Sequence, residues 1–375
     1  MSVLAGLRFW SRDPVGRKIH DWYLKKQLER GPRIVAIGGG TGLPVVLRGL
    51  KAYTANLTAV VTVADDGGSS GRLRGELGIL PPGDIRNCLV ALADTEPLME
   101  SLFQHRFERG AGLAGHSFGN LFIAAMTEVT GDFEAAVVES SRVLKVRGTV
   151  LPSTLENVVL EAELTDGEIV SGETAIALGA REKPIRRVRL RPSEPKALPA
   201  AVRAIEIADA VVLGPGSLYT SIIPNLLVPA IRRAVVRAAE RGIPVALVMN
   251  VMTQPGETTG FGACDHLKVV RDVLGGGVNW VVVNSERIPF ELKRKYEEDG
   301  AAVVSAPPGL LEREGVRVMR ARLLDTDALR GSGGAGLARH DPERLAGAIL
   351  KMIGRRVPAG APRERKGGRL LDVSR

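Results

Sequence analysis

A glycine-rich loop between an apolar strand and an amphipathic helix is the feature that most constrains how this chain folds. Residues 34–37 are apolar, GGGTG follows at 38–42, and apolar residues recur at helical spacing over 43–50. Glycine lets a ligand approach the backbone, and the unpaired N–H groups of a first helical turn favour an anion. The segment therefore predicts a phosphate site where a strand passes into a helix.

Two further strands are expected to bring polar loops to the same edge of the sheet. The apolar run 57–63 leads into DDGGSSGR at 65–72, and the run 210–213 leads into GPGS at 214–217. Because open α/β sheets bind ligands at the carboxyl ends of their strands, two glycine turns on one sheet predict a diphosphate. The alternative, in which the glycines serve only tight connections, stays open. GGGTG departs from the G-x-G-x-x-G spacing, so it is not a standard NAD fingerprint.

Hydrophobic periodicity predicts an α/β, Rossmann-like fold with a mostly parallel sheet covered by helices on both faces. Residues 148–195 change to a period of two, which predicts a small antiparallel β elaboration on this domain. The chain then divides into a basic, aromatic arm (1–32), a Rossmann-like domain (33–354) and a basic tail (355–375) that is expected to be disordered. The expected strands are 34–37, 57–63, 148–152, 158–164, 168–171, 210–213, 245–248 and 280–283, and the expected helices are 43–50, 85–93, 98–107, 118–129, 133–144, 200–207, 229–241, 266–274, 289–298 and 341–353.

Composition and charge exclude several classes of protein. The net charge of +9 is concentrated in the terminal segments, and no DNA- or RNA-binding pattern accompanies it, so no nucleic acid partner is expected. Cys88 and Cys264 are too few for a disulfide framework or a zinc site. The apolar runs fall far short of the roughly 20 residues of a membrane-spanning helix, and no signal peptide precedes the first strand. A cytoplasmic protein is therefore expected.

The arm before residue 33 combines aromatic with basic residues. Phe9, Trp10, Trp22 and Tyr23 lie among arginines and lysines. Such a segment is either an amphipathic helix that docks on a membrane surface or a partner, or a short helix that packs its aromatic side chains on the main domain. The second interpretation is favoured, because one apolar face normally means core.

Two adjacent aspartates are candidates for a metal site. Asp65 and Asp66 follow a strand, and carboxylates beside a phosphate can hold Mg²⁺. However, successive strand residues point to opposite faces, and Asp beside glycine also forms turns and helix caps. Both interpretations stay open.

Three arginines near the aspartates are candidates for phosphate contacts. Arg72, Arg74 and Arg86 can each donate two hydrogen bonds to a phosphate. The alternative is that they pair with Asp84 or Glu76. Asp84 is also expected to be the N-cap of the helix that follows it.

Polar residues at other loop ends extend the candidate site. His116 and Ser117 precede an apolar helix, where the imidazole acts as a general acid or base, or simply bonds to a ligand or loop. The loop NVMTQPGET at 250–258 follows a strand and offers amides and hydroxyls to a base or a sugar. Tyr296 and Arg339 are candidates for stacking and for charge contact.

Seven motifs between residues 33 and 353 together carry a family resemblance. They are GGGTG at 38–42, VTVADDGGSSGRLR at 61–74, PPGDIRN at 81–87, LFQHRF at 102–107, GHSFGN at 115–120, GPGSLYTS at 214–221 and NVMTQPGET at 250–258. In this combination the chain resembles the gluconeogenesis-factor (YvcK-like) family. That family is similar in turn to 2-phospho-L-lactate transferase (CofD-like), which has a Rossmann-like fold.

The resemblance implies a cytoplasmic bacterial protein that is required for cell shape and for cell-wall (peptidoglycan) synthesis under gluconeogenic growth. It also implies binding of a nucleotide-activated sugar of the UDP-N-acetylglucosamine class, or of a dinucleotide, with no required cofactor. Carried over by position, the residues that line or close this site are Gly38, Gly39, Gly40, Thr41, Gly42, Asp65, Asp66, Gly214, Gly216, Ser217, Asn250, Tyr296 and Arg339. The motifs add Ser69, Ser70, Arg72, Asn87, His116, Asn120 and Thr253.

A regulator and an enzyme remain as alternatives. The absence of a nucleophile–base pair favours a ligand-sensing regulator without catalytic residues, whose expected partners are a nucleotide sugar, a cell-wall synthesis or regulatory protein and a second copy of itself. The alternative is a magnesium-dependent nucleotide or phospholactate transferase in which Asp65 and Asp66 hold the metal. The ADDGGSSGR form of the loop differs from the transferase branch, so transfer does not follow from the resemblance. Membrane contact through the arm stays a weaker expectation, and the arm is too polar to be a membrane segment.

Overall fold

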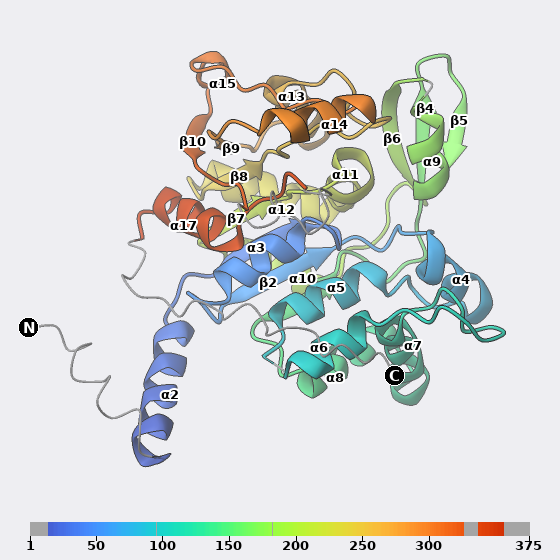
Figure 1. The fold of residues 1–375 in the computed structure, drawn as a ribbon, viewed down its shortest axis with the longest axis vertical. Helices are drawn as coiled ribbons and strands as arrows, with labels where there is room; N and C mark the ends of the chain where they lie inside the picture. The colour runs from blue at the N-terminus through green and yellow to red at the C-terminus, as the bar shows by residue number, and fades with distance from the viewer. Residues whose placement is uncertain (1–13, 95, 182, 326–336, 356–375) are drawn as a thin grey trace, which may run out of the picture.

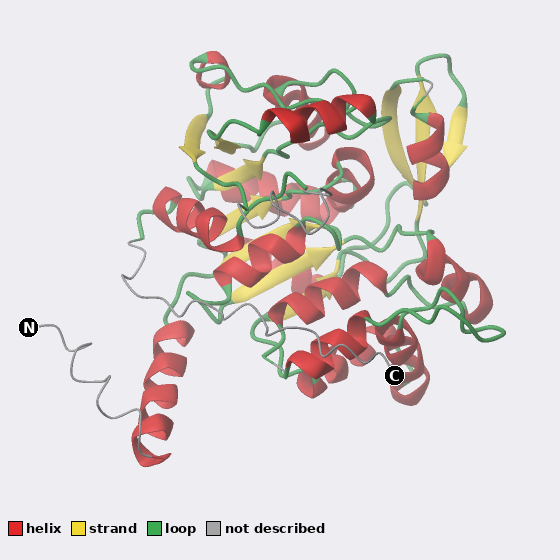
Figure 2. Cartoon of the chain, in the orientation of Figure 1, coloured by secondary structure: helices red, strands yellow, loops and turns green. Residues whose placement is uncertain are grey.

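A seven-stranded parallel sheet forms the centre of the computed structural model, which describes residues 14–94, 96–181, 183–325 and 337–355 (Figures 1 and 2). Its strand order is β10-β9-β8-β7-β1-β2-β3, and every neighbouring pair is parallel. The Rossmann-like prediction is therefore confirmed. The strands are β1 (Ile34–Gly38), β2 (Leu57–Val61), β3 (Thr149–Pro152), β7 (Ala210–Leu213), β8 (Val245–Val248), β9 (Trp280–Asn284) and β10 (Arg317–Ala321).

The strand order reverses at β1. This strand pairs with β2 on one side and with β7 on the other, so the chain runs outward from β1 in both directions. A reversal of this kind opens a crevice at the carboxyl ends of the two central strands, because the connections that follow them leave in opposite directions. The two glycine turns follow β1 and β7, and they therefore flank the crevice.

Helices cover the sheet in two packed groups (Figure 1). The strands between them are nearly continuous runs of buried Val, Ile, Leu and Ala, as expected for a sheet covered on both faces. The first group comprises α3 (Leu43–Leu50), α5 (Gly83–Leu92), α8 (Phe133–Val143) and α17 (Pro342–Met352), and the second comprises α10 (Pro199–Glu206), α11 (Ile223–Leu226), α12 (Pro229–Glu240) and α13 (Ala263–Leu274). The remaining helical segments are α4 (Gly68–Leu77), α6 (Pro97–Gln104), α7 (Phe118–Thr130), α14 (Phe290–Glu298), α15 (Leu310–Arg313) and a π-helical turn, η1 (Leu218–Ile222).

A small antiparallel sheet, ordered β5-β4-β6, stands beside the main one. It contains β4 (Val159–Leu164), β5 (Ile169–Ser171) and β6 (Ile185–Arg191), with α9 (Glu173–Gly179) between the last two. The prediction of a hairpin between β4 and β5 is confirmed. The prediction that 148–152 belongs to the elaboration is wrong, because β3 pairs parallel with β2 at the edge of the main sheet.

Helix α2 (Pro14–Glu29) extends from the domain (Figure 1). Trp22 is 61% exposed and Tyr23 is 39% exposed, so the expectation that the arm packs its aromatic side chains on the domain is wrong for Trp22. Phe9, Trp10 and the basic tail lie outside the described residues. Within the part of the chain that the structure describes, no helix has the length and apolarity needed to cross a membrane.

Candidate functional site

The two glycine turns touch each other at the reversal point of the sheet. A Cβ atom added to Gly42 would lie 2.1 Å from the carbonyl oxygen of Pro215, and one added to Gly40 would lie 2.5 Å from Cα of Asp84. The glycines at 38–42 all have negative φ, whereas Gly214 has φ 71° and Gly216 has φ 150°. In the first turn glycine is therefore needed for close packing, and in the second it also permits the backbone conformation.

Few backbone amides of the two turns are free for a ligand. The Gly40 amide donates to the Asp84 carboxylate, and the Gly214 amide donates to the carbonyl of Ile37. Pro44, in the first turn of α3, has no N–H to offer. The amides of Thr41, Gly42 and Ser217 have no acceptor among the described residues, so these three can donate to an anion.

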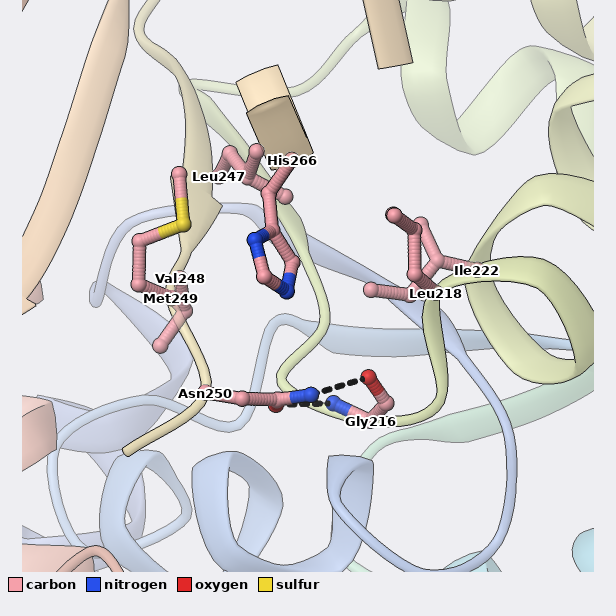
Figure 3. Close-up of a pocket in the computed structure, with 8 residues that line it drawn as sticks. All are labelled: Gly216, Leu218, Ile222, Leu247, Val248, Met249, Asn250 and His266. Carbon is pink, nitrogen blue, oxygen red and sulfur yellow. Dashed lines mark hydrogen bonds between the residues drawn. The ribbon is translucent and has the colours of Figure 1, made fainter. Parts of the chain in front are cut away.

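Asn250 clamps the second glycine turn. Its Oδ1 accepts from the Gly216 amide at 3.0 Å, and its Nδ2 donates to the Gly216 carbonyl at 2.8 Å (Figure 3). The Ser217 hydroxyl donates to Gln254 at 2.7 Å, which ties the turn to the same loop. Thr253, by contrast, uses its hydroxyl and its amide on the backbone of Ala302, so this predicted ligand residue holds the loop in place instead.

Asp66 attaches the antiparallel elaboration to the main domain. Its Oδ1 accepts from the amide of Thr174 at 3.1 Å and from the hydroxyl of Thr174 at 3.2 Å, at the start of α9. Gly172 makes this approach possible, since a Cβ there would lie 1.9 Å from Oδ2 of Asp66. Asp65 turns the other way and accepts from the Gly67 amide at 2.8 Å. The adjacent pair therefore does not fit a shared metal site. No cluster of three or more His, Cys, Asp or Glu in the described ranges is arranged to hold a metal ion.

We expect Asp66→Ala to loosen α9 without unfolding the sheet. The substitution removes both bonds to Thr174, and the loss of a helix cap costs about 1 kcal/mol. Urea unfolding should show this loss, and hydrogen–deuterium exchange over residues 173–179 should become faster. Asp66→Asn is the matched control, because its Oδ1 still accepts. Equal effects of the two substitutions would mean that the carboxylate charge, not the cap, matters.

Four acidic side chains, Asp65, Asp84, Glu173 and Glu257, interact around the glycine turns. Burial, and secondarily the charge of Asp65, raises the pKa of Asp84 to about 7. Burial, followed by the charges of Asp84 and Asp65, raises the pKa of Glu173 to about 9. Glu257 is also buried with a raised pKa, and it accepts from the Tyr219 amide and the Thr220 hydroxyl at the start of η1. At neutral pH, Glu173 carries a proton and Asp84 is near its own pKa, so both groups can donate hydrogen bonds.

Asp84 does not cap the helix that follows it. Helix α5 begins at Gly83 with Pro82 as the N-cap residue, which places Asp84 inside the first turn. Its carboxylate faces Gly39 and Gly40 instead. The Ser70 hydroxyl accepts from the Gly83 amide at 3.1 Å, so this predicted ligand residue supports the start of α5.

His116 belongs to a buried hydrogen-bonded network. Its Nδ1 lies 2.9 Å from the Ser69 hydroxyl, to which Nδ2 of Asn120 donates at 3.1 Å. Burial, and then the charge of Arg72, lowers the pKa of His116, so the imidazole is neutral at pH 7. Ser117 is the N-cap of α7. The structure thus brings these predicted residues together, and Oδ1 of Asn120 is buried without a partner among the described residues.

The three candidate arginines bind protein groups, and none forms an ion pair with Asp84 or Glu76 in the described ranges. Arg72 donates to the carbonyl of Ala114, and Arg74 donates to the carbonyl of Val158. Arg86 is buried, and it donates to the Ser117 hydroxyl at 2.5 Å and to Oδ1 of Asn87 at 2.7 Å. Arg86 is connected to the first glycine turn through Asn87, because Arg86 donates to Asn87 and Asn87 lies against Gly40.

Tyr296 contacts the segment that contains Arg339, although the two residues are far apart in sequence. The Tyr296 hydroxyl accepts from the amide of Ala338 at 3.1 Å. Tyr296 also packs on a small cluster that contains Val251 and Met252, directly after Asn250. Arg339 is exposed and has no ion-pair partner among the described residues. Tyr296 therefore borders the 250–258 loop, and Arg339 follows Ala338, the residue bonded to Tyr296.

Comparison with known proteins places these residues in a family context. The family model of 2-phospho-L-lactate transferase CofD matches residues 34–324. The gluconeogenesis factor of Bacillus subtilis is 50% identical over 326 residues, which cover 86% of this chain and 98% of the relative. The putative gluconeogenesis factor of Nostoc is 50% identical over 331 residues, which cover 88% of this chain and 70% of the relative. A crystal structure from Bacillus halodurans, described as a member of the UPF0052 family, is 46% identical with a TM-score of 0.79, covering 85% of this chain and 99% of that one.

Proposed function

The chain belongs to the 2-phospho-L-lactate transferase CofD family and, as its motifs predict, to the gluconeogenesis-factor family within it, and we propose that it is a cytoplasmic regulator that binds a nucleotide-activated sugar of the UDP-N-acetylglucosamine class. The observation that carries this proposal is the contact of two glycine turns at the reversal point of the sheet, with the free amides of Thr41, Gly42 and Ser217. Two adjoining turns that form one cradle suit the two phosphates of a diphosphate.

The proposed nucleotide extends from the glycine turns toward β8. Asn250 fixes the second turn, and Tyr296 and Arg339 border the loop that follows. An aromatic ring is suited to stacking on a base, and a guanidinium without an ion-pair partner in the described part of the chain is suited to contact with a phosphate or a ribose. The sugar then faces the wall that contains His116 and Asn120, whose polar atoms suit hydroxyl or amide groups.

The acidic side chains favour a ligand that binds together with protons. A diphosphate beside four carboxylates would be repelled if all of them were ionised. Because the pKa values of Asp84 and Glu173 are raised to about 7 and about 9, these groups can instead donate hydrogen bonds to the ligand at neutral pH. Binding then requires no metal ion. Ligand occupancy would be passed to a cell-wall synthesis partner and so support cell shape under gluconeogenic growth.

A magnesium-dependent transferase is the second candidate function, and membership of a transferase family favours it. The fit of a metal is poor, because Asp66 accepts from Thr174 at the start of α9, whereas Asp65 accepts from the amide of Gly67. The family connection alone supports this alternative.

Calorimetric titration with UDP-N-acetylglucosamine, NAD and GTP, each with and without magnesium, separates the two functions. For the regulator we expect metal-independent preference for the UDP-sugar, which is recovered intact. Magnesium-dependent GTP binding, or breakdown of the ligand, would establish the transferase instead.

Arg339→Ala should weaken binding of UDP-N-acetylglucosamine about tenfold, because a charge-assisted hydrogen bond contributes about 1.5 kcal/mol or more. The free energy of unfolding should change little, since the side chain is exposed and has no ion-pair partner in the described ranges. Arg203→Ala is the matched control: this arginine is exposed on α10, beside the groove at the amino ends of the strands. Equal affinity of wild type and Arg339→Ala would remove Arg339 from the site.

A further inference from the structure

A small cavity lies directly behind the second glycine turn (Figure 3). Its walls come from the end of β8, from the turn and η1, and from the first part of α13. The volume open to a water centre is about 10 Å³, which is the room for about one water molecule. The lining residues are Gly216, Leu218, Ile222, Leu247, Val248, Met249, Asn250 and His266.

His266 places an unused hydrogen-bond acceptor in this cavity. Its Nδ1 lies 2.8 Å from the carbonyl oxygen of Gly262. A carbonyl only accepts, so Nδ1 carries the proton, and Nε2 of the neutral ring is left with a bare lone pair. The residue is 3% exposed, and Nε2 has no partner in the described part of the chain.

The ring of His266 is held in this orientation. The Phe261 ring packs against it edge-to-face, with centroids 5.6 Å apart, and Tyr219 packs on Phe261 in turn. Figure 3 shows Nε2 directed toward the paired hydrogen bonds between Asn250 and Gly216, here called the Gly216–Asn250 clamp. The other walls are mainly apolar, so the clamp is the polar group that a molecule in the cavity would meet besides His266.

We propose that this cavity binds one water molecule, which donates one hydrogen bond to Nε2 of His266 and a second to an oxygen of the Gly216–Asn250 clamp. A buried water needs two to four polar partners, and a cavity of this size keeps a single water in contact with both groups. His266 is then a positioning residue. It acts through the water on the glycine turn that holds the ligand, and it does not touch the ligand itself.

The role in ligand binding rests on the proposed function, whereas the water site does not. Two measurements on the ligand-free protein therefore test the site by itself. A crystal structure that resolves ordered waters should contain one water bonded both to His266 Nε2 and to the clamp. Hydrogen–deuterium exchange of the Gly216 amide should become about tenfold faster in His266→Leu, because the variant has no acceptor to hold the water.

His266→Gln is the matched control, since its amide oxygen can still accept from the water. We expect this variant to keep the exchange rate of the Gly216 amide and the affinity for UDP-N-acetylglucosamine within about threefold of wild type, and His266→Leu to lose about tenfold in affinity. A cavity without water, or a water that bonds to His266 but not to the clamp, would overturn the proposal. So would equal exchange rates in the Leu and Gln variants. A third outcome is possible, in which the Gly216 amide exchanges more slowly in His266→Gln than in His266→Leu but wild type does not bind the UDP-sugar. That outcome would support the water site and reject only the proposed ligand.

Discussion

Gly42→Ala is expected to weaken the binding of UDP-N-acetylglucosamine by about 100-fold or more, equivalent to about 2.7 kcal/mol. The added Cβ would lie 2.1 Å from the Pro215 carbonyl oxygen and 2.5 Å from its carbon, and both are backbone atoms that no side-chain rotation can move. The two glycine turns must therefore separate. Because Thr41, Gly42 and Ser217 form one cradle only while the turns touch, separation removes the anion site.

The free energy of unfolding of Gly42→Ala shows whether the substitution disturbs only the two glycine turns or destabilises the whole domain. Overpacking of this kind costs about 1–3 kcal/mol, so the variant should remain folded while binding is lost. Gly75→Ala is the matched control, because this glycine is in α4 and has no atom within 4 Å of an added Cβ. We expect it to stabilise the protein by about 0.5–1 kcal/mol without changing affinity. Gly42→Ala with wild-type affinity would disprove that the ligand lies between the two turns.

Most of the fold was predictable because its elements have regular hydrophobic periods. The runs at 210–213 and 245–248 match β7 and β8, and the expected helix at 118–129 differs from α7 by one residue. Strand direction was harder to predict. The run at 148–152 alternates like an antiparallel strand, yet it pairs parallel with β2, since pairing depends on the crossover through α4–α8 and not on the strand's own pattern.

The candidate site was predictable only where its residues follow buried strands. The glycine turns and Asn250 follow β1, β7 and β8, and strand order brings them together. Glu173 was missed because it enters from the antiparallel elaboration, through an attachment at Asp66 that no local pattern reveals. His266 was missed because its sequence context is that of any residue on an amphipathic helix. Only the tertiary structure shows that its Nε2 has no partner among the described residues.

Asp84→Asn is expected to stabilise the protein in alkaline buffer and to make ligand binding less sensitive to pH. Burial and the neighbouring charge of Asp65 raise the pKa of Asp84 from 3.8 to about 7. Between these values the folded state binds more protons than the unfolded state, so stability falls as the pH rises through this window. Asparagine mimics the protonated acid, since it can accept from the Gly40 amide and donate at the same time. Its free energy of unfolding should exceed that of wild type by about 4 kcal/mol near pH 8, the full effect of a pKa raised from 3.8 to about 7, and should differ little near pH 4.

The same proton connects stability to ligand binding. A diphosphate beside Asp84 favours the protonated carboxyl, so wild type should take up protons on binding and lose affinity from about pH 6 to about pH 8. Burial lowers the pKa values of His116 and His266, and it lowers the pKa of His340 to about 4, below this window. Calorimetry in two buffers of different ionisation enthalpy measures the proton uptake directly. Uptake that persists unchanged in Asp84→Asn would show that a group other than Asp84 gains the proton, and that group cannot be Glu173, whose pKa of about 9 already leaves it protonated across the same range. Binding without any proton uptake would show that the ligand does not lie beside the acidic side chains, and the diphosphate would have to be placed on the β8 side of the glycine turns.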